Sequence, residues 1–185
     1  MYVPSGHRPG LGQVNASRGA IAQALVRTEP YRGAPHTIEN IHRAVNAGRK
    51  DASGRAVVED ICKGLYAKDY LSEAAASYYA TCRGTRYMRD PATVELVKEP
   101  HLITRTRAVD CDEQTALIAT LLGHAGIGSV EYTTVGFQPG AETHVFVTFP
   151  DPRGSGRRVV LDPVAGPTTA TMLRRVKHVR RYSGF

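Results

Sequence analysis

The chain lacks several features that define common protein classes. Its 185 residues include no tryptophan and three cysteines, Cys62, Cys82 and Cys111, which are odd in number and far apart. This spacing argues against a disulfide framework and against a zinc site built from CxxC pairs. No apolar run approaches the ~18 residues of a membrane span. The first residues have neither the basic start nor the apolar stretch of a signal peptide, so we expect a cytoplasmic protein.

Acidic residues are fewer than basic residues. There are 24 Lys and Arg against 17 Asp and Glu, which gives a formal net charge of +7. Five of the eight residues at 174–181 are Lys or Arg, and such a segment can contact nucleic acid or an acidic partner. Met172, Val176 and Val179 recur at helical spacing, so we favour a helix docked on the core with a solvated basic face. Without Trp, an RNA-binding aromatic motif or a zinc finger, sequence-specific nucleic-acid binding is not expected.

The length and the 42% of hydrophobic residues fit one domain with a sizeable core. We divide the chain into an extended arm at 1–36, a domain at 37–166 and a basic tail at 167–185. The arm is rich in Gly, Pro and polar residues, a composition typical of loosely held segments. We expect no membrane contact, and the arm and tail are the candidate docking elements for a larger assembly.

Three helices are predicted in the first half of the chain. The first runs from Thr37, a plausible N-cap, to Gly48. The second lies within 54–70 and carries an apolar stripe at Val57, Ile61 and Leu65. The third runs from Ser72 as its cap to Gly84. An extended segment broken by two prolines follows at 85–103.

A fourth helix and three strands complete the predicted domain. Asp110 followed three residues later by Glu113 resembles a capping box, so Cys111 falls in the first turn of an apolar helix that Gly126 ends. The segments 130–137, 143–149 and 157–163 alternate as strands and are separated by turn-rich loops, which is typical of an antiparallel meander. Helices followed by such a sheet predict an α+β fold.

The predicted topology brings together residue types suited to nucleophilic catalysis. A catalytic cysteine needs a base, and the base needs a group that orients it. His144 opens one strand and Asp162 ends the next, so antiparallel pairing makes them neighbours. The helix start that carries Cys111 then packs across them, which gives a candidate Cys111–His144–Asp162 triad.

The thiol of Cys111 lies between two aspartates, which oppose its ionisation. The helix dipole favours a thiolate by roughly 0.3–1 kcal/mol, too little to outweigh two close carboxylates. We therefore expect pairing with His144 to supply the ionisation. Since successive helix positions are ~100° apart, Asp112 is expected to point away from the thiol.

Three stretches, "VDCDEQTALIATLLGHAGI", "THVFV" and "VVLDPV", resemble the core of the transglutaminase-like superfamily, which shares the catalytic logic of papain. The resemblance covers roughly residues 55–165 and is to small bacterial and phage-encoded members. It implies a papain-like α+β fold with Cys111 as nucleophile, His144 as base and Asp162 as the orienting group. Val109 stands where many members have Gly, and Glu113 where a second Asp is common. The Trp that some members place near the oxyanion is absent, so the backbone N–H of Cys111 is the expected donor, beside a second group that the sequence does not identify.

The resulting hypothesis is a cysteine enzyme that attacks an amide carbonyl and needs no metal or cofactor. Resolution of the acyl-enzyme by water would make it a peptidase or deamidase, and resolution by an amine would make it an acyl transferase. The substrate would be a protein or peptide. The alternative is a structural component of a phage particle, incorporated in the virion, or of another large assembly that keeps this fold. Two further alternatives for Cys111 are a small residue filling a helix–sheet seam and a zinc ligand beside His144 and another cysteine, although the spacing fits no common zinc pattern.

Overall fold

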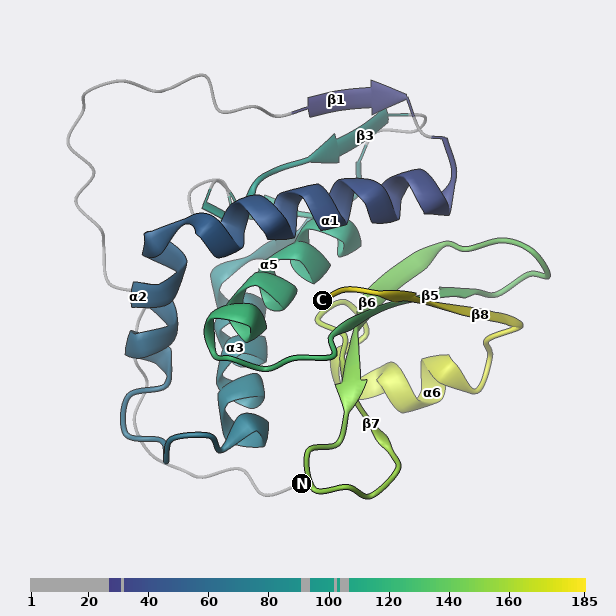
Figure 1. Cartoon of the computed structure of the whole chain (residues 1–185). Coiled ribbons are helices and arrows are strands. Elements are labelled where there is room, and N and C mark those ends of the chain that lie inside the picture. The colour runs from purple at the N-terminus through teal and green to yellow at the C-terminus, as the bar shows by residue number, and fades with distance from the viewer. Residues whose placement is uncertain (1–26, 31, 91–93, 102, 104–106) are drawn as a thin grey trace.

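The computed structural model describes residues 27–30, 32–90, 94–101, 103 and 107–185. Helices come first along the chain and an antiparallel sheet follows, which confirms the α+β class (Figure 1). The helices are α1 Ala34–Lys50, α2 Ala52–Ile61, α3 Tyr70–Gly84, α5 Cys111–His124, the 3-10 helix η1 Gly166–Thr168 and α6 Thr169–Leu173. The strands are β1 Arg27–Pro30, β2 Arg86–Tyr87, β3 Val94–Val97, β4 Ala108–Val109, β5 Glu131–Gly136, β6 His144–Pro150, β7 Arg158–Leu161 and β8 His178–Ser183. Among the helices of the described part, none is both long enough and apolar enough to cross a membrane.

The main sheet has the strand order β7-β6-β5-β8, and all its neighbours are antiparallel. The three strands expected from the sequence are β5, β6 and β7. Both inner strands are buried on both faces: Tyr132 of β5 and Val147 of β6 are fully buried, and so is Phe146 on the opposite face of β6. One face of the sheet packs against α5, and the chain continues from β7 into η1 and α6 (Figure 1).

The basic C-terminal segment is part of the sheet, so the predicted boundary at residue 166 is wrong. β8 pairs with β5 along its whole length, from Ser183 opposite Glu131 to His178 opposite Gly136. The expected docked helix is wrong as well, because α6 ends at Leu173 and the chain then becomes extended. The pairing with β5 therefore makes this segment an edge strand, with His178 and Tyr182 partly buried and the residues between them exposed.

The caps of the first helices differ from the predicted ones. α1 starts after Gly33 rather than at Thr37, which is buried within the helix. α3 is capped by Asp69, whose carboxylate accepts hydrogen bonds from the N–H and hydroxyl of Ser72 at 3.3 and 2.7 Å. Asp and Ser are about equally favourable as N-caps, and here the cap lies three residues before the predicted one. α2 ends at Ile61, so the stripe does not extend as a helix to Leu65.

Gly48 marks a helix crossing rather than a helix end. α1 continues to Lys50, and a Cβ at Gly48 would lie 2.8 Å from both Pro100 and Thr120. The absence of a side chain lets α1 approach α5 closely. α5 is buried along nearly its whole length, with Ile118 and Leu122 fully inaccessible. α5 is thereby enclosed between α1 and the inner strand β6.

Most of the predicted N-terminal arm, residues 1–26, lies outside the described residues. The part that is described is not a separate arm. β1 pairs antiparallel with β3, from Arg27 opposite Val97 to Pro30 opposite Val94. The N-terminal boundary of the folded unit therefore lies before residue 37.

Candidate functional site

The N-terminus of α5 is fixed by a capping box, as the sequence predicted. Asp110 Oδ1 accepts the N–H groups of Asp112 and Glu113 at 3.0 and 3.2 Å, and Glu113 Oε2 accepts the N–H of Asp110 at 3.2 Å. Cys111 is consequently the first residue of the helix, where backbone N–H groups are free of helical partners.

A buried ion pair anchors this helix start to the preceding segment. Lys98 Nζ lies 2.8 and 3.1 Å from the two carboxylate oxygens of Glu113, and it also donates to the carbonyl of Ala108 at 3.1 Å. Glu113 is fully buried, and its carboxylate also accepts the N–H of Asp110 in the capping box and the backbone N–H of Lys98, each at 3.2 Å. The ion pair thus fixes β4 and the first turn of α5 relative to each other.

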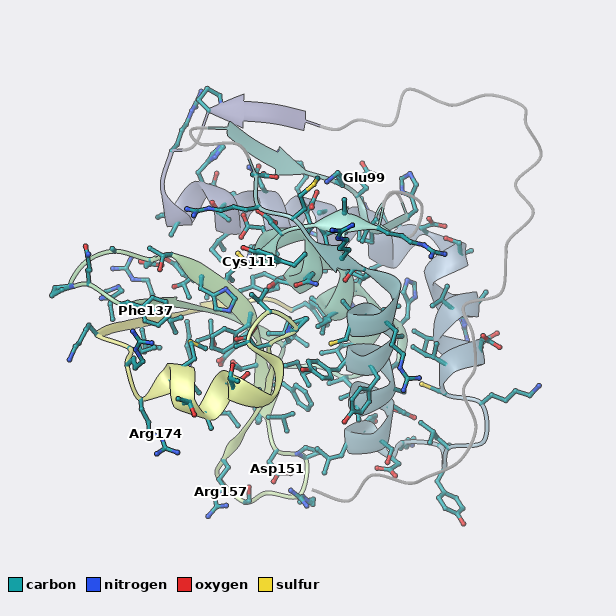
Figure 2. The ribbon with its side chains drawn as sticks, turned by 180° about the vertical axis from the view of Figure 1, so that it is seen from behind. Glu99, Cys111, Phe137, Asp151, Arg157 and Arg174 are labelled. Carbon is teal, nitrogen blue, oxygen red and sulfur yellow. The ribbon has the colours of Figure 1, made fainter. Side chains whose placement is uncertain are left out.

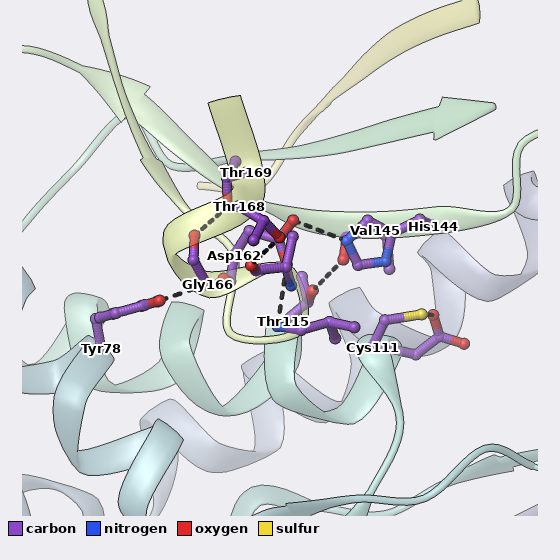
Figure 3. Close-up of polar contacts among 12 residues, drawn as sticks. Tyr78, Cys111, Thr115, His144, Val145, Asp162, Gly166, Thr168 and Thr169 are labelled. Carbon is purple, nitrogen blue, oxygen red and sulfur yellow. Dashed lines mark hydrogen bonds and ion pairs between the residues drawn. The ribbon is translucent and has the colours of Figure 1, made fainter. Parts of the chain in front are cut away.

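His144 and Asp162 are brought together by the pairing of β6 with β7. Val147 of β6 lies opposite Leu161 of β7, so the start of β6 lies beside the residue that follows β7. His144 Nε2 is 2.9 Å from Asp162 Oδ2 (Figure 3). The Asp162 side chain is fully buried and that of His144 is 12% exposed, so water screens this contact little.

Asp162 is held on several sides. Its other carboxylate oxygen, Oδ1, accepts the N–H groups of Val164 and Ala165 at 3.1 and 3.0 Å, which forms a tight turn before η1. The hydroxyl of Tyr78, on α3, donates to its backbone carbonyl at 3.4 Å (Figure 3). The orienting carboxylate is therefore positioned by its own turn and by a separate helix. Tyr78 was not predicted, because helix periodicity gives it only a packing role.

The Cys111 thiol makes its hydrogen bond with Asp112, at 3.3 Å from Sγ to Oδ1. The expectation that Asp112 points away from the thiol is wrong, because its Oδ1 lies within hydrogen-bonding distance of Sγ. In the described part of the chain no hydrogen bond joins the thiol to His144. The structure thus pairs two of the three predicted residues, and it places the third at the adjacent helix start.

The surroundings of Cys111 keep the thiol protonated. Burial is the largest cause that raises its pKa well above the ordinary value, and the charges of Asp112 and Asp110 raise it further. The backbone N–H of Val145, next to His144 on β6, acts in the opposite direction and favours the thiolate. The carbonyl of Val145 accepts the Thr115 hydroxyl of α5 at 3.2 Å, so this strand end is fastened to the helix that carries the thiol.

The pKa of the Asp110 carboxyl is also shifted. Burial, followed by the charges of Asp90 and Glu113, raises the pKa of its carboxyl to about 7. Asp110, Cys111 and Asp112 each have a potential metal-ligand atom, all within 4.8 Å of one another. The Asp110 oxygen is already engaged by two backbone N–H groups, and a protonated thiol is a poor ligand. We assign no metal or cofactor to this cluster.

No family model and no curated protein matches the chain. Among solved structures, one described as a putative protease from Parabacteroides distasonis ATCC 8503 is similar, with a TM-score of 0.49 and 11% sequence identity. The similarity covers 72% of this chain and 27% of that protein, so the chain spans about a quarter of its length. The argument for function therefore depends on the geometry of the site.

Proposed function

We propose that the protein is a transglutaminase-like cysteine enzyme that attacks an amide carbonyl with Cys111. The observation that carries the proposal is the 2.9 Å contact between His144 and the buried Asp162, made at the strand end next to the helix start that bears the thiol. A buried carboxylate on one ring nitrogen fixes the tautomer and orientation of a histidine. The order of cysteine on a core helix, histidine on a strand and aspartate after the next strand also matches the resemblance in sequence.

The hydrogen bond to Asp162 assigns the two nitrogens of His144. A carboxylate accepts, so Nε2 carries the proton and Nδ1 has the lone pair that can receive one. In the proposed reaction the thiol leaves Asp112 and transfers its proton to Nδ1. Sulfur then forms a bond to the carbonyl carbon, and the backbone N–H of Cys111 donates to the resulting oxyanion, because the N–H groups of Asp112 and Glu113 are engaged by the Asp110 cap.

The tetrahedral intermediate collapses when the C–N bond breaks and the leaving amine takes the proton from Nδ1. A thioester to Cys111 remains. Water, deprotonated by His144, attacks this thioester to release the acid and restore the thiol. An amine in place of water completes an acyl transfer. Asp162 stabilises the imidazolium that forms in both halves of the reaction.

The test is covalent labelling by a peptide-like electrophile, such as a peptidyl vinyl sulfone. The wild-type protein should be labelled at Cys111, and the variants Cys111→Ser and His144→Ala should not. Cys62, which follows α2, and Cys82, on α3, serve as internal controls, because neither thiol is on α5. Labelling that survives His144→Ala unchanged would show that His144 is not the base, and the proposal would then fail.

One observation favours a second candidate, a structural component of a phage particle or another large assembly that retains the fold. The thiol is held by Asp112, and its raised pKa leaves it protonated at neutral pH. A protein that no longer used the thiol would tolerate this arrangement. Retention in a large particle with no reaction of Cys111 toward the vinyl sulfone would favour the second candidate. A monomer of constant mass whose Cys111 is labelled would favour the enzyme.

A further inference from the structure

Large apolar side chains are exposed around the candidate site. Four of them belong to the segments that lead into or out of it: Tyr87, Met88, Phe137 and Val164, with exposed fractions of 47%, 55%, 42% and 39%. Solitary exposed hydrophobic residues are ordinary, whereas a group gathered from separate segments around one site indicates binding. We call these four residues the apolar rim.

The first half of the apolar rim is fixed beside Cys111 by β-pairing. β2 runs parallel to β4 with Tyr87 opposite Val109, and the N–H of Met88 donates to the carbonyl of Val109 at 2.7 Å. Val109 is separated from Cys111 by a single residue. Burial is the largest cause that raises the pKa of the Tyr87 phenol, and a charge on Cys111 raises it next, which agrees with this proximity.

The second half lies on the side of His144 and Asp162. Val164 lies in the turn after Asp162, and its backbone N–H donates to the Asp162 carboxylate at 3.1 Å. Phe137 directly follows β5, where Val135 pairs with His144. Figure 2 labels Phe137 and Cys111 among the side chains seen from behind. The two halves therefore belong to the two parts of the site, one beside Cys111 and one beside His144 and Asp162.

Positive charge accompanies both halves of the rim. Arg86 and Arg89 flank Tyr87 and Met88, and the N–H of Arg86 donates to the carbonyl of Arg107 at 2.5 Å. The N–H of Lys177 donates to the carbonyl of Gly136, next to Phe137, at 2.9 Å. All four cationic residues, Arg86, Arg89, Arg107 and Lys177, are exposed, and none forms an ion pair with a residue that the structure describes.

We infer that the site takes an extended peptide segment with a large apolar side chain beside the attacked amide and acidic residues further along on both sides. This inference rests on the proposed function and names its substrate class. The apolar rim would cover the large side chain, and the flanking cations would complement the acidic residues. The carboxylate of Asp112 lies at the thiol, so acidic residues fit away from the reacting bond rather than next to it.

The experiment measures binding separately from reaction. Fluorescently labelled peptides would be titrated with the full-length Cys111→Ala protein, and binding would be followed by fluorescence anisotropy. The set has one peptide with a central Phe and flanking Glu, a second with central Ser and flanking Glu, and a third with central Phe and flanking Lys. We expect the first to bind at least about tenfold more tightly than either other peptide, the scale on which apolar pockets discriminate. Its affinity should also fall as salt is raised, because exposed charges are screened.

Matched variants in the Cys111→Ala protein test the rim and the cations separately. Tyr87→Ser with Met88→Ser should weaken the Phe–Glu peptide while leaving the Ser–Glu peptide unchanged. The control is Tyr66→Ser, because Tyr66 is 86% exposed and lies in the connection between α2 and α3, away from the rim. Arg86→Gln with Arg89→Gln should reduce the salt dependence, because two of the four flanking cations are removed, whereas Arg157→Gln, in the exposed turn between β6 and β7, should not.

The outcomes separate this inference from the proposed function. Equal affinity for the three peptides, or tighter binding of a single-stranded oligonucleotide than of the Phe–Glu peptide, would overturn the inference. Cleavage of Phe and Ser peptides at equal rates by the wild-type protein would overturn it while leaving the proposed function standing. The expected binding preference in the absence of any reaction at Cys111 would support the inference as a peptide-binding surface and contradict the enzymatic proposal.

Discussion

His144 Nε2 lies 2.9 Å from Asp162 Oδ2, and this contact joins the first residue of β6 to the residue that follows β7. The Asp162 carboxylate is fully buried, and its other oxygen is occupied by two backbone N–H groups. The carboxylate is thereby limited to one orientation, and His144 is the side chain it can orient.

Asp162→Asn tests this relationship. Asparagine keeps an oxygen for the turn but cannot stabilise a histidine that has taken up a proton. We expect the rate of covalent labelling of Cys111 by the vinyl sulfone to fall by about 10²-fold or more, within the range that acid–base groups contribute. The free energy of unfolding should change by no more than about 1–2 kcal/mol, the size of one or two altered hydrogen bonds. A labelling rate within a factor of three of wild type would show that Asp162 stabilises the turn and does not assist His144.

The contact between Cys111 and Asp112 leads to a second prediction. Asp112 raises the pKa of a thiol that burial has already raised, and it accepts the thiol proton at 3.3 Å. Asp112→Asn should therefore lower the pH at which Cys111 reacts with iodoacetamide and increase the rate at pH 7 several-fold, because one pKa unit is a tenfold change in thiolate. Mass spectrometry would locate the label, and the rates at Cys62 and Cys82 should stay unchanged. Faster reaction at all three cysteines would indicate loosening of the fold instead.

The sequence predicted the parts of the site that depend on local signals. The capping box at Asp110 and Glu113 needs residues only three positions apart, and the approach of His144 to Asp162 follows once 143–149 and 157–163 pair as a hairpin. Contacts between residues far apart in the sequence leave no comparable local pattern from which they could be predicted. The Tyr78 hydroxyl reaches Asp162 across 84 positions, and Lys98 pairs with Glu113 across a segment that reads only as extended.

The C-terminal segment shows why a helical spacing can mislead. Met172, Val176 and Val179 match a helix stripe, but the residues that bind the sheet are His178, Arg180 and Tyr182, at a period of two. Their partner is Glu142, which contacts His178, Arg180 and Tyr182 at 3.5, 3.3 and 3.1 Å. Glu142 precedes these three residues by 36 or more positions, and β5, with which the segment pairs, is further away still, so a short stretch of sequence does not contain both sides of these contacts.

Removal of residues 174–185 should consequently unfold or strongly destabilise the protein, contrary to what a separate tail predicts. The deletion takes away β8, exposes the fully buried Tyr132 and Val135 of β5, and removes the contacts of Glu142 with His178, Arg180 and Tyr182. Each large side chain returned to water costs about 1.5–3 kcal/mol, so we expect a loss of roughly 3–6 kcal/mol. Urea denaturation would measure it. Arg174→Gln with Arg175→Gln is the control, because it removes charge and keeps the strand, and its stability should remain within about 0.5 kcal/mol of wild type. A truncated protein of wild-type stability would show that β8 contributes little to the fold.

The last prediction concerns the pH dependence that Asp110 imposes on stability. Burial and the neighbouring charges of Asp90 and Glu113 raise the pKa of Asp110 from 3.8 to about 7 in the folded state. The folded protein thus holds this proton more tightly than the unfolded chain does. The contribution to stability is fully present below about pH 4 and is lost as the pH rises through about 7. Burial also raises the pKa of Glu113, although Lys98 opposes the shift, so its effect has the same sign.

Asp110→Asn separates the charge of Asp110 from its capping role. Asparagine caps helices as well as aspartate does, so its side-chain oxygen can still accept the N–H groups of Asp112 and Glu113. We expect the wild-type protein to lose stability between pH 5 and pH 8 and the variant to lose less. The difference should be of the order of 1–4 kcal/mol, because each pKa unit corresponds to about 1.4 kcal/mol. Urea denaturation at fixed ionic strength across this pH range would measure how the free energy of unfolding changes with pH in the wild type and in the variant. Parallel slopes would show that Asp110 is ionised in the folded state throughout, and a steeper slope for the variant would reverse the sign assigned to its burial.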